Sequence, residues 1–348
     1  TAMVLGAGFS RSSVLVGRPV YGARPEAWGA LEDKMIIDQL LDDAGVSRAP
    51  SAIVPVADAP AAAADLASDL GTVWVADNHE GWHGGGEYVR WIRSPGDVAP
   101  AVEWFDEHAA RVRVMPFLDG IPCSIHGFST HDGVAVFLPV EMVILRRVDR
   151  PEFVYAQAAN FWNPPAAIRD EMRGAARQLG MLLKERYGYL GGYGIDGVCT
   201  PGGFLPTELN PRRSRGHHRH TLAADIPLSL MELMQLEGDL EISSAQLEEC
   251  VLAAALESRR GGMLLPLGGH EEPREIGIRF IDGRAVAVDP EGVTDATMRI
   301  GPALMGSIVI VTYEPDRTPI GPSVGPRSVA AIDLAREMWD LDIPDVTP

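Results

Sequence analysis

Two carboxylates and an amide lie close together in one stretch of the sequence, GYGIDGVCTPGGFLPTELNPR at residues 192–212. A short apolar pattern ends at Asp196, a glycine-rich turn follows, and Glu208 and Asn210 stand two positions apart. Side chains two apart on a strand share a face, and a hairpin would bring Asp196 across from them. Magnesium takes carboxylate and amide oxygens from proteins and completes its shell with phosphates and water. The stretch therefore predicts a site for one or two Mg²⁺ ions, although a surface hairpin with solvated polar residues would show the same spacing.

The residues that follow, RRSRGHHRH at 212–220, are rich in cationic side chains. Arg212 continues the alternation of the strand, so its guanidinium could stabilise a phosphoryl-transfer transition state or a tetrahedral acyl intermediate. We expect the rest to form a loop that binds a substrate carboxylate through bidentate arginine. The candidates are Arg213, Arg215 and His217. A solvated loop would explain the same composition, whereas a zinc site lacks a cysteine or carboxylate to complete it.

The surrounding pattern mixes helices with strands. Helices are predicted over 32–44, 59–70, 98–110, 164–187, 227–236, 241–260 and 328–341. Strands are predicted over 3–5, 51–58, 71–78, 87–92, within 111–147, and within 275–290 and 307–315. The pair 71–78 and 87–92 forms a hairpin tipped with glycine and aromatic residues.

Composition limits the classes of partner. The chain has 348 residues, enough for two or three subdomains, and contains no apolar run near the roughly 20 residues of a membrane span. Its net charge of −18 argues against general binding to nucleic acid or anionic membranes. Three widely spaced cysteines, Cys123, Cys199 and Cys250, indicate free thiols and a cytoplasmic location. Only two lysines are present, Lys34 and Lys184, and the chain opens without Met, so we suspect that it begins partway into a longer product.

Asp196 with ELNPR at 208–212 resembles the C-terminal metal-binding strands of the ATP-grasp superfamily, in particular of the carboxylate–amine ligases that join amino acids or peptides. The segment EDKMIIDQLLDDAGVSRAPS resembles the helix and strand in which Lys34 would contact an ATP phosphate. The match covers roughly residues 31–225. It implies that Asp196, Glu208 and Asn210 carry Mg²⁺.

Two further segments resemble this family. HEGWHGGGEYV resembles the glycine-rich lid hairpin, whose backbone N–H groups can close over phosphates. The implied residues there are Gly84, Gly85 and Gly86. VMPFLDGIPCSIHGF resembles the hinge strand. Backbone groups of Phe117 and Leu118 would read the adenine edge, and Asp119 could bind the ribose.

The sequence also departs from the family pattern. The strand before the lid loop usually carries a second lysine, and here VWVADN offers Ala76, Asp77 and Asn78. Met115 replaces the hinge glutamate that often meets the adenine amino group. Arginines that could supply the missing charge are Arg90, Arg93 and Arg113.

The resemblance implies an α+β architecture, the ATP-grasp fold, with two α+β subdomains gripping ATP between them and a C-terminal α/β extension. The expected divisions are a remnant of the N-terminal pre-ATP-grasp domain at 1–30, a small lid subdomain at 31–112, a central subdomain with the metal site at 113–240, and the extension at 241–348.

The implied activity is an ATP-dependent carboxylate–amine ligase that uses ATP and Mg²⁺. It would form an amide or peptide bond through an acyl phosphate, with Arg212 stabilising the oxyanion, in peptide or secondary-metabolite biosynthesis. We expect small-molecule or peptide carboxylates and amines as substrates, and a homodimer as the oligomer. Two alternatives are a non-catalytic nucleotide-binding protein that kept the fold, and an ATP-grasp ligase with a thiol or carrier-protein acceptor.

Overall fold

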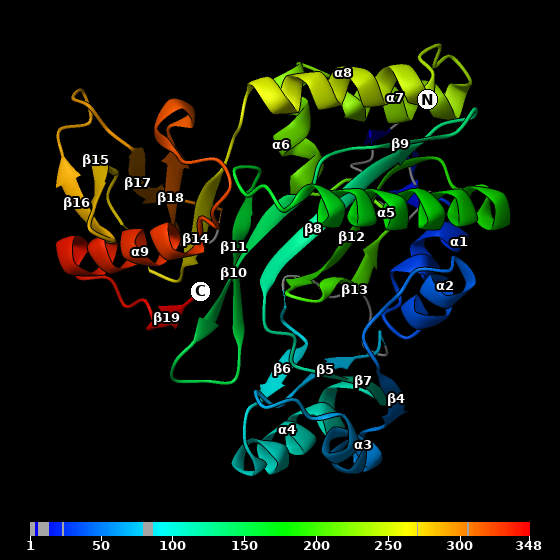
Figure 1. Ribbon diagram of the computed structural model, residues 1–348, viewed down its shortest axis with the longest axis horizontal. Coiled ribbons are helices and arrows are strands. Elements are labelled where there is room, and N and C mark those ends of the chain that lie inside the picture. The colour runs from blue at the N-terminus through cyan, green and yellow to red at the C-terminus, as the bar shows by residue number, and fades with distance from the viewer. Residues whose placement is uncertain (1–3, 6–13, 23, 79–85, 270, 305) are drawn as a thin grey trace.

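The computed structural model describes residues 4–5, 14–22, 24–78, 86–269, 271–304 and 306–348 (Figure 1). Within these ranges, the chain forms a small N-terminal sheet, a four-stranded lid sheet, a large central sheet and a five-stranded C-terminal sheet. The lid sheet lies at one end of the molecule, and the C-terminal sheet lies beside the central one (Figure 1).

The N-terminal elements lead into the central core. They are β1 (Val4–Leu5), β2 (Val14–Leu15), β3 (Arg18–Tyr21), α1 (Glu26–Gly29), η1 (Ala30–Glu32) and α2 (Ile37–Asp43). Helix α2 places Ile37, Leu40 and Leu41 on one face because helical neighbours lie three and four positions apart. These side chains pack with the central subdomain, so α2 belongs to that core, although we expected it in the lid.

The lid subdomain is a sheet covered by two helices. Its elements are β4 (Ala52–Pro55), η2 (Val56–Asp58), α3 (Ala59–Leu66), β5 (Thr72–Ala76), β6 (Val89–Ile92), α4 (Pro95–His108) and β7 (Arg111–Pro116). The strand order is β4-β7-β5-β6, and the predicted antiparallel hairpin of β5 and β6 is confirmed. Buried Trp74 and Phe105 lie at the centre of its core. Strand β7 continues to Pro116, so the lid sheet extends beyond residue 112, where we expected it to end.

The central subdomain is built on strands in the order β11-β10-β8-β12-β13, with β9 beside β8. The strands are β8 (Ile121–Ser129), β9 (Val134–Val136), β10 (Val140–Arg147), β11 (Phe153–Ala159), β12 (Gly191–Thr200) and β13 (Gly203–Asn210). The long helix α5 (Ala166–Tyr187) packs Met172, Leu179 and Leu183 into the core. Helices α7 (Leu228–Glu237) and α8 (Ser244–Glu257) pack on a separate cluster around Phe128 and Phe137.

The predicted loop at 212–220 is wrong, because most of it forms helix α6 (Arg215–Ala224). Gly216 allows the helix to approach the central sheet, since a Cβ there would lie 2.0 Å from the Cε1 atom of His126. The buried positions Gly216, His217 and His220 recur at helical spacing. That pattern was present in the sequence, but the cationic residues between these positions concealed it.

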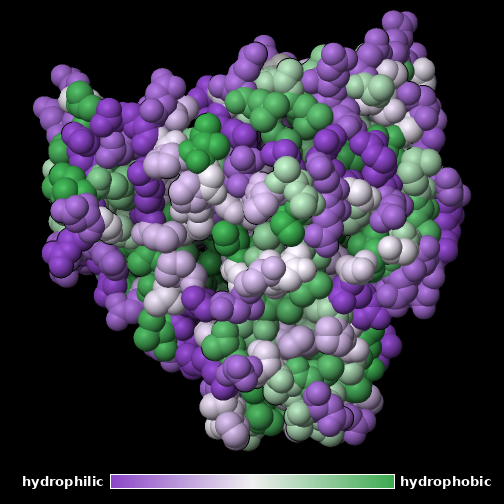
Figure 2. Space-filling model, in the orientation of Figure 1, coloured by the Kyte–Doolittle hydropathy of each residue, from purple (hydrophilic) through white to green (hydrophobic). Residues whose placement is uncertain are grey.

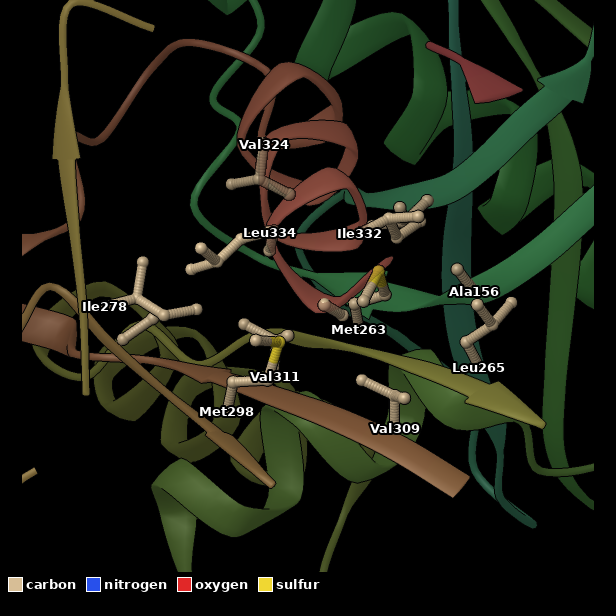
Figure 3. Close-up of a cluster of buried hydrophobic side chains, with 14 of the residues drawn as sticks. Ala156, Met263, Leu265, Ile278, Met298, Val309, Val311, Val324, Ile332 and Leu334 are labelled. Atoms are coloured by element: carbon tan, nitrogen blue, oxygen red, sulfur yellow. The ribbon is translucent and has the colours of Figure 1, made fainter. Parts of the chain in front are cut away.

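The C-terminal extension packs a sheet on one helix. Its elements are β14 (Gly262–Leu267), β15 (Arg274–Ile281), β16 (Arg284–Val288), β17 (Ala296–Pro302), β18 (Ser307–Tyr313), η3 (Pro315–Arg317), α9 (Gly325–Trp339) and β19 (Val346–Thr347). Figure 3 shows its core, where Met298 and Val311 of the sheet and Leu334 of α9 belong to one buried cluster. Strand β19 pairs with β10, and Glu141 of β10 accepts the Val324 N–H at 2.8 Å at the start of α9. These contacts join the extension to the central subdomain.

The visible surface is mixed in polarity. Hydrophilic residues are spread over every part of the face in Figure 2, with hydrophobic residues between them. None of the helices in the described ranges is both long enough and apolar enough to cross a membrane.

Candidate active site

The hairpin of β12 and β13 brings the three expected metal ligands together. Asp196 lies directly opposite Glu208, and Gly194 lies opposite Asn210, in the antiparallel register. The Asn210 Nδ2 atom donates a hydrogen bond to Asp196 Oδ2 at 2.8 Å. Directly opposed residues place their side chains on the same face of the sheet. The two carboxylates and the amide therefore share one side of the hairpin.

Asp196 is in an environment that disfavours its charged form. Burial, followed by the nearby Glu208 carboxylate, raises the pKa of Asp196 from 3.8 to about 6. The Ser124 hydroxyl, Arg212 and Lys34 act in the opposite direction but do not cancel these effects. Two like charges facing each other cost free energy unless a cation lies between them. The hairpin is therefore electrostatically suited to bind a cation.

Lys34 forms an ion pair with a carboxylate of this hairpin. Its Nζ atom lies 2.8 Å from Glu208 Oε1, and the lysine side chain is 9% exposed. The residue follows η1, and the Asp33 carboxylate accepts the Met35 N–H at 2.9 Å, which fixes the turn that positions it. An ammonium here can contact both the carboxylate and a phosphate bound beside it.

Arg212 is held beside the amide by a buried carboxylate. Its Nη2 atom donates to Asn210 Oδ1 at 3.0 Å and its Nε atom donates to Glu32 Oε1 at 3.0 Å. Arg24 donates to the same Glu32 oxygen at 3.0 Å and to the Pro211 carbonyl at 2.7 Å. Sequence reasoning missed Glu32 and Arg24, because nothing in their local pattern identifies a partner about 180 positions away. Glu32 and Asn210 together fix the Arg212 guanidinium through two hydrogen bonds, and Arg24 in turn holds Glu32.

The remaining candidates around α6 divide into structural and exposed residues. Arg213 donates to Glu232 at 2.5 Å and to the Ser229 hydroxyl at 2.7 Å, so it ties β13 to α7. His217 is buried, accepts the Ser214 N–H at 3.1 Å and pairs with the Gly127 carbonyl at 3.0 Å.

Burial lowers the pKa of His217 to about 3, so the ring is neutral. Because both of its ring nitrogens are bonded within the chain, neither is available to a substrate, contrary to our expectation. Only Arg215 among the three candidates is exposed.

The backbone groups of Phe117, expected to read adenine, are already hydrogen-bonded within the chain. The Phe117 N–H donates to the Gly71 carbonyl at 2.9 Å, and the Phe117 carbonyl accepts from the Ser68 hydroxyl at 3.0 Å. Both of its backbone groups are thus bonded inside the lid, so they cannot read adenine as we expected. Its ring stacks on Trp91 at 4.6 Å. Leu118 follows with a half-buried side chain.

The other nucleotide-binding candidates lie at the edge of the described ranges. Gly86 has a left-handed backbone, with φ of +81°, which suits a glycine. Gly84 and Gly85 lie outside the described residues. Asp119 is exposed just after the hinge.

The segment expected to carry the lid lysine, residues 76–78, includes a carboxylate that has a structural contact. Asp77 accepts the Arg111 N–H at 2.8 Å at the start of β7. Each of the three arginines considered as substitutes has a partner within the described part of the chain. Arg113 binds Asp38 at 2.7 Å, Arg90 lies 3.7 Å from the Trp104 ring centre, and Arg93 pairs with Asp97 at 3.8 Å.

The donor set fits magnesium bound together with phosphates. Among the residues that the structure describes, no group of three or more His, Cys, Asp and Glu side chains is placed to hold a metal. The hairpin instead offers two carboxylates and an amide, all oxygen donors, and leaves the remaining positions of an octahedral ion to other oxygens. Phosphate oxygens and water are the usual donors of that kind.

Comparison with solved structures identifies folds similar to this one. The chain matches pyruvate carboxylase from Rhizobium etli over 92% of its own length, with a TM-score of 0.58 and 16% identity, and spans 28% of that enzyme. It matches an ADP complex of N5-carboxyaminoimidazole ribonucleotide synthetase with a TM-score of 0.56 and 12% identity, covering 93% of this chain and 75% of that one. An L-amino acid ligase from Bacillus licheniformis matches with a TM-score of 0.52 and 14% identity, covering 93% and 74%.

No protein-family model matches the sequence, and no curated protein matches it. The structural matches cover nearly the whole chain, and the strands that carry Asp196 and Glu208 pair as the motif required. The chain has the ATP-grasp fold, an α+β fold, as predicted from the sequence.

Proposed function

We propose that this protein is an ATP-dependent carboxylate–amine ligase that forms an amide bond through an acyl phosphate. One observation carries the proposal: Asp196, Glu208 and Asn210 share one side of a hairpin that Lys34 and Arg212 contact directly. The structures with the same fold include an amino acid ligase and a synthetase bound to ADP, which supports ATP as the phosphoryl donor.

Each residue has a proposed role. Asp196, Glu208 and Asn210 would hold Mg²⁺, which neutralises charge on the phosphates when it is bound. Lys34 would donate to a phosphate oxygen beside Glu208. Arg212 would bind the oxyanion that develops during phosphoryl transfer and amide formation, since Glu32 already fixes its orientation.

At the hinge we assign adenine recognition to the peptide groups on either side of Phe117. Thr72 pairs with Pro116 on β5 and β7, and Phe117 bonds to Gly71. Because successive residues of an extended strand direct their backbone groups to opposite sides, the Pro116 carbonyl and the Leu118 N–H point away from β5. Asp119 would bind the ribose, and Gly84, Gly85 and Gly86 would contact phosphates.

The reaction balances with ATP, an acid and an amine. A carboxylate oxygen attacks the γ-phosphorus, the bond to the bridging oxygen breaks, and ADP leaves. The amine then attacks the acyl carbon, inorganic phosphate leaves, and the amine loses a proton. No side chain forms a covalent bond in either step.

A second candidate is a nucleotide-binding protein without ligase activity. Asp77 favours this second candidate. A carboxylate stands in the segment where ATP-grasp enzymes usually carry a phosphate-binding lysine. A ligase with a thiol acceptor would share every residue named above and differ only in the nucleophile.

A screen for ADP release tests these alternatives. We expect ADP release that requires Mg²⁺, an acid and an amine, and we expect Glu208→Ala to remove it while the circular dichroism spectrum is unchanged. Release with a thiol in place of the amine identifies the thiol ligase. Saturable ATP binding without ADP release for any pair would reject the ligase.

A further inference from the structure

Two arginines on helix α6 lack the carboxylate partners that their neighbours have. Arg212 pairs with Glu32, and Arg213 pairs with Glu232. Arg215 and Arg219 lie one turn apart on the same helix face, and neither forms an ion pair within the described part of the chain. In a protein with a net charge of −18, two such cations side by side are an unusual concentration of positive charge.

Arg219 is oriented by the neighbouring strand β11. Its Nε atom donates to the Ala158 carbonyl at 2.9 Å, and its Nη2 atom donates to Gln157 Oε1 at 3.2 Å. Gln157 is buried and has φ of +127°, a backbone conformation that side chains rarely adopt, at a register shift between β10 and β11. Strain of this kind persists where surrounding contacts compensate for it, and it clusters at ligand sites. Here the strained backbone directs the Gln157 side chain toward the Arg219 guanidinium.

Tyr155 completes the cluster on the side of the metal-binding hairpin. It is half-buried on β11, and its hydroxyl lies in the field of Asp196, Arg215 and Arg219. Burial raises the pKa of Tyr155 to about 12, so the group remains a neutral hydroxyl that can donate a hydrogen bond. The Asp196 carboxylate also raises this pKa, so the Tyr155 hydroxyl interacts electrostatically with the carboxylate that we assign to Mg²⁺.

We propose that Arg215, Arg219 and Tyr155 form a subsite for a second anionic group on the acid substrate, so that the acid carries a negative charge besides the carboxylate that is phosphorylated. This inference rests on the proposed function for the place of the reacting carboxylate. Gln157 is a positioning residue, because it acts through Arg219.

The chemistry of the three side chains fits a carboxylate or a phosphate. A guanidinium binds either group through paired N–H donors, and a tyrosine hydroxyl adds a third. Arg219 is half-buried with neutral hydrogen-bond partners and no carboxylate within the described residues, so an anionic ligand would offset the cost of desolvating its charge. A neutral side chain of the same shape leaves both guanidinium groups uncompensated.

Isosteric pairs of amino acids provide the test. We would measure dissociation constants by calorimetry for glutamate against glutamine, aspartate against asparagine, and phosphoserine against serine, with and without Mg²⁺ and a non-hydrolysable ATP analogue. The expected result is that at least one anionic member binds about tenfold or more tightly than its neutral partner, a difference that a charge-assisted pair supplies. The first two pairs test a carboxylate, and the third tests a phosphate.

Variants assign that preference to the cluster. Arg215→Gln and Arg219→Gln should each reduce the anionic preference to about threefold or less, and Tyr155→Phe should reduce it by a smaller factor. Arg219→Lys should recover part of it by restoring the charge. Arg186→Gln, which removes an ion pair between the end of α5 and Asp43 of α2, should leave the anionic preference unchanged. Circular dichroism checks that each variant folds.

The outcomes separate this subsite from the ligase activity. If all three pairs bind equally, or if no anionic member binds, the subsite is wrong whatever the activity. If anionic members bind preferentially through the arginines but no acid supports ADP release, the subsite stands and the ligase fails. If release occurs equally with glutamine and glutamate and the arginine variants do not alter it, the ligase stands and the subsite fails.

Discussion

At the scale of single residues, the candidate site contains an ion pair whose two members differ in solvent exposure. Lys34 is almost buried, whereas the Glu208 carboxylate it contacts is 33% exposed. Asp196 faces Glu208, and burial followed by that neighbouring carboxylate raises its pKa. The site is therefore arranged to attract a cation from solvent while Lys34 stays fixed.

Asp196 should make the metal-free protein less stable as pH rises. Its pKa is about 6 in the folded protein and 3.8 ordinarily, so the folded state binds the proton more tightly between these values. The stability that this group contributes is present below about pH 4 and is lost as pH rises through about 6. Urea unfolding of wild type and Asp196→Asn at pH 4.5 and 7.5 should show a larger loss at the higher pH for wild type. An equal pH dependence in both proteins would contradict the shift.

Lys34→Met should weaken ATP binding about tenfold or more, because it removes a charge-assisted contact to phosphate. The matched control is Lys184→Met, since Lys184 is half-buried on α5 and donates to the His131 carbonyl at 2.8 Å. ATP titration of both variants by calorimetry is the measurement. Equal affinities for the two variants would remove Lys34 from the nucleotide site.

At the scale of elements, close packing between α6 and the central sheet sets the position of the arginines. A Cβ at Gly216 would lie 2.0 Å from the His126 ring, and the ring is fully buried. Gly216→Ala should therefore destabilise the fold by about 1–3 kcal/mol through overpacking.

The control for this prediction is Gly174→Ala on α5, where a Cβ meets nothing within 4 Å. That change should stabilise the protein by roughly 0.5–1 kcal/mol, because alanine loses less conformational freedom in a helix. Chemical denaturation gives both values. Stabilisation by both substitutions would show that α6 does not pack closely on His126.

An interaction could be predicted from the sequence when its residues lie close together along the chain. The hairpin of Asp196 and Glu208 was predictable, because the alternation and the turn lie within about 20 residues. Helix α6 was not, because its buried face is made of glycine and histidine instead of aliphatic residues. The partners of Arg213 and Arg212, on α7 and η1, depend on tertiary packing that no local pattern encodes.

At the scale of the whole molecule, the lid sheet is joined to the central subdomain through a buried ion pair. Arg113 of β7 is 1% exposed, binds Asp38 of α2 at 2.7 Å, and donates to the Thr207 carbonyl of β13 at 2.9 Å. A single side chain thus connects the lid sheet, α2 and the hairpin of β12 and β13. This connection explains why Arg113 cannot serve as the missing phosphate ligand.

Arg113→Ala should destabilise the protein by about 3–5 kcal/mol, because it leaves the Asp38 carboxylate without its buried partner. Arg48→Ala is the matched control, since Arg48 approaches the same carboxylate at 3.6 Å from a more exposed position and should cost only about 0–1 kcal/mol. Thermal and urea unfolding measure both. A similar small cost for the two variants would contradict the role of Arg113.

Divalent-cation binding in the presence of nucleotide tests whether the hairpin of β12 and β13 binds a metal ion. We would titrate Mn²⁺, as a paramagnetic substitute for Mg²⁺, into protein saturated with ADP and follow the free ion by electron paramagnetic resonance. The account predicts at least one bound ion in the wild type and an affinity lower by about tenfold or more in Asp196→Asn and in Glu208→Gln, both folded by circular dichroism. Mn²⁺ binding of equal strength in the wild type and both variants would show that these strands do not form the metal site.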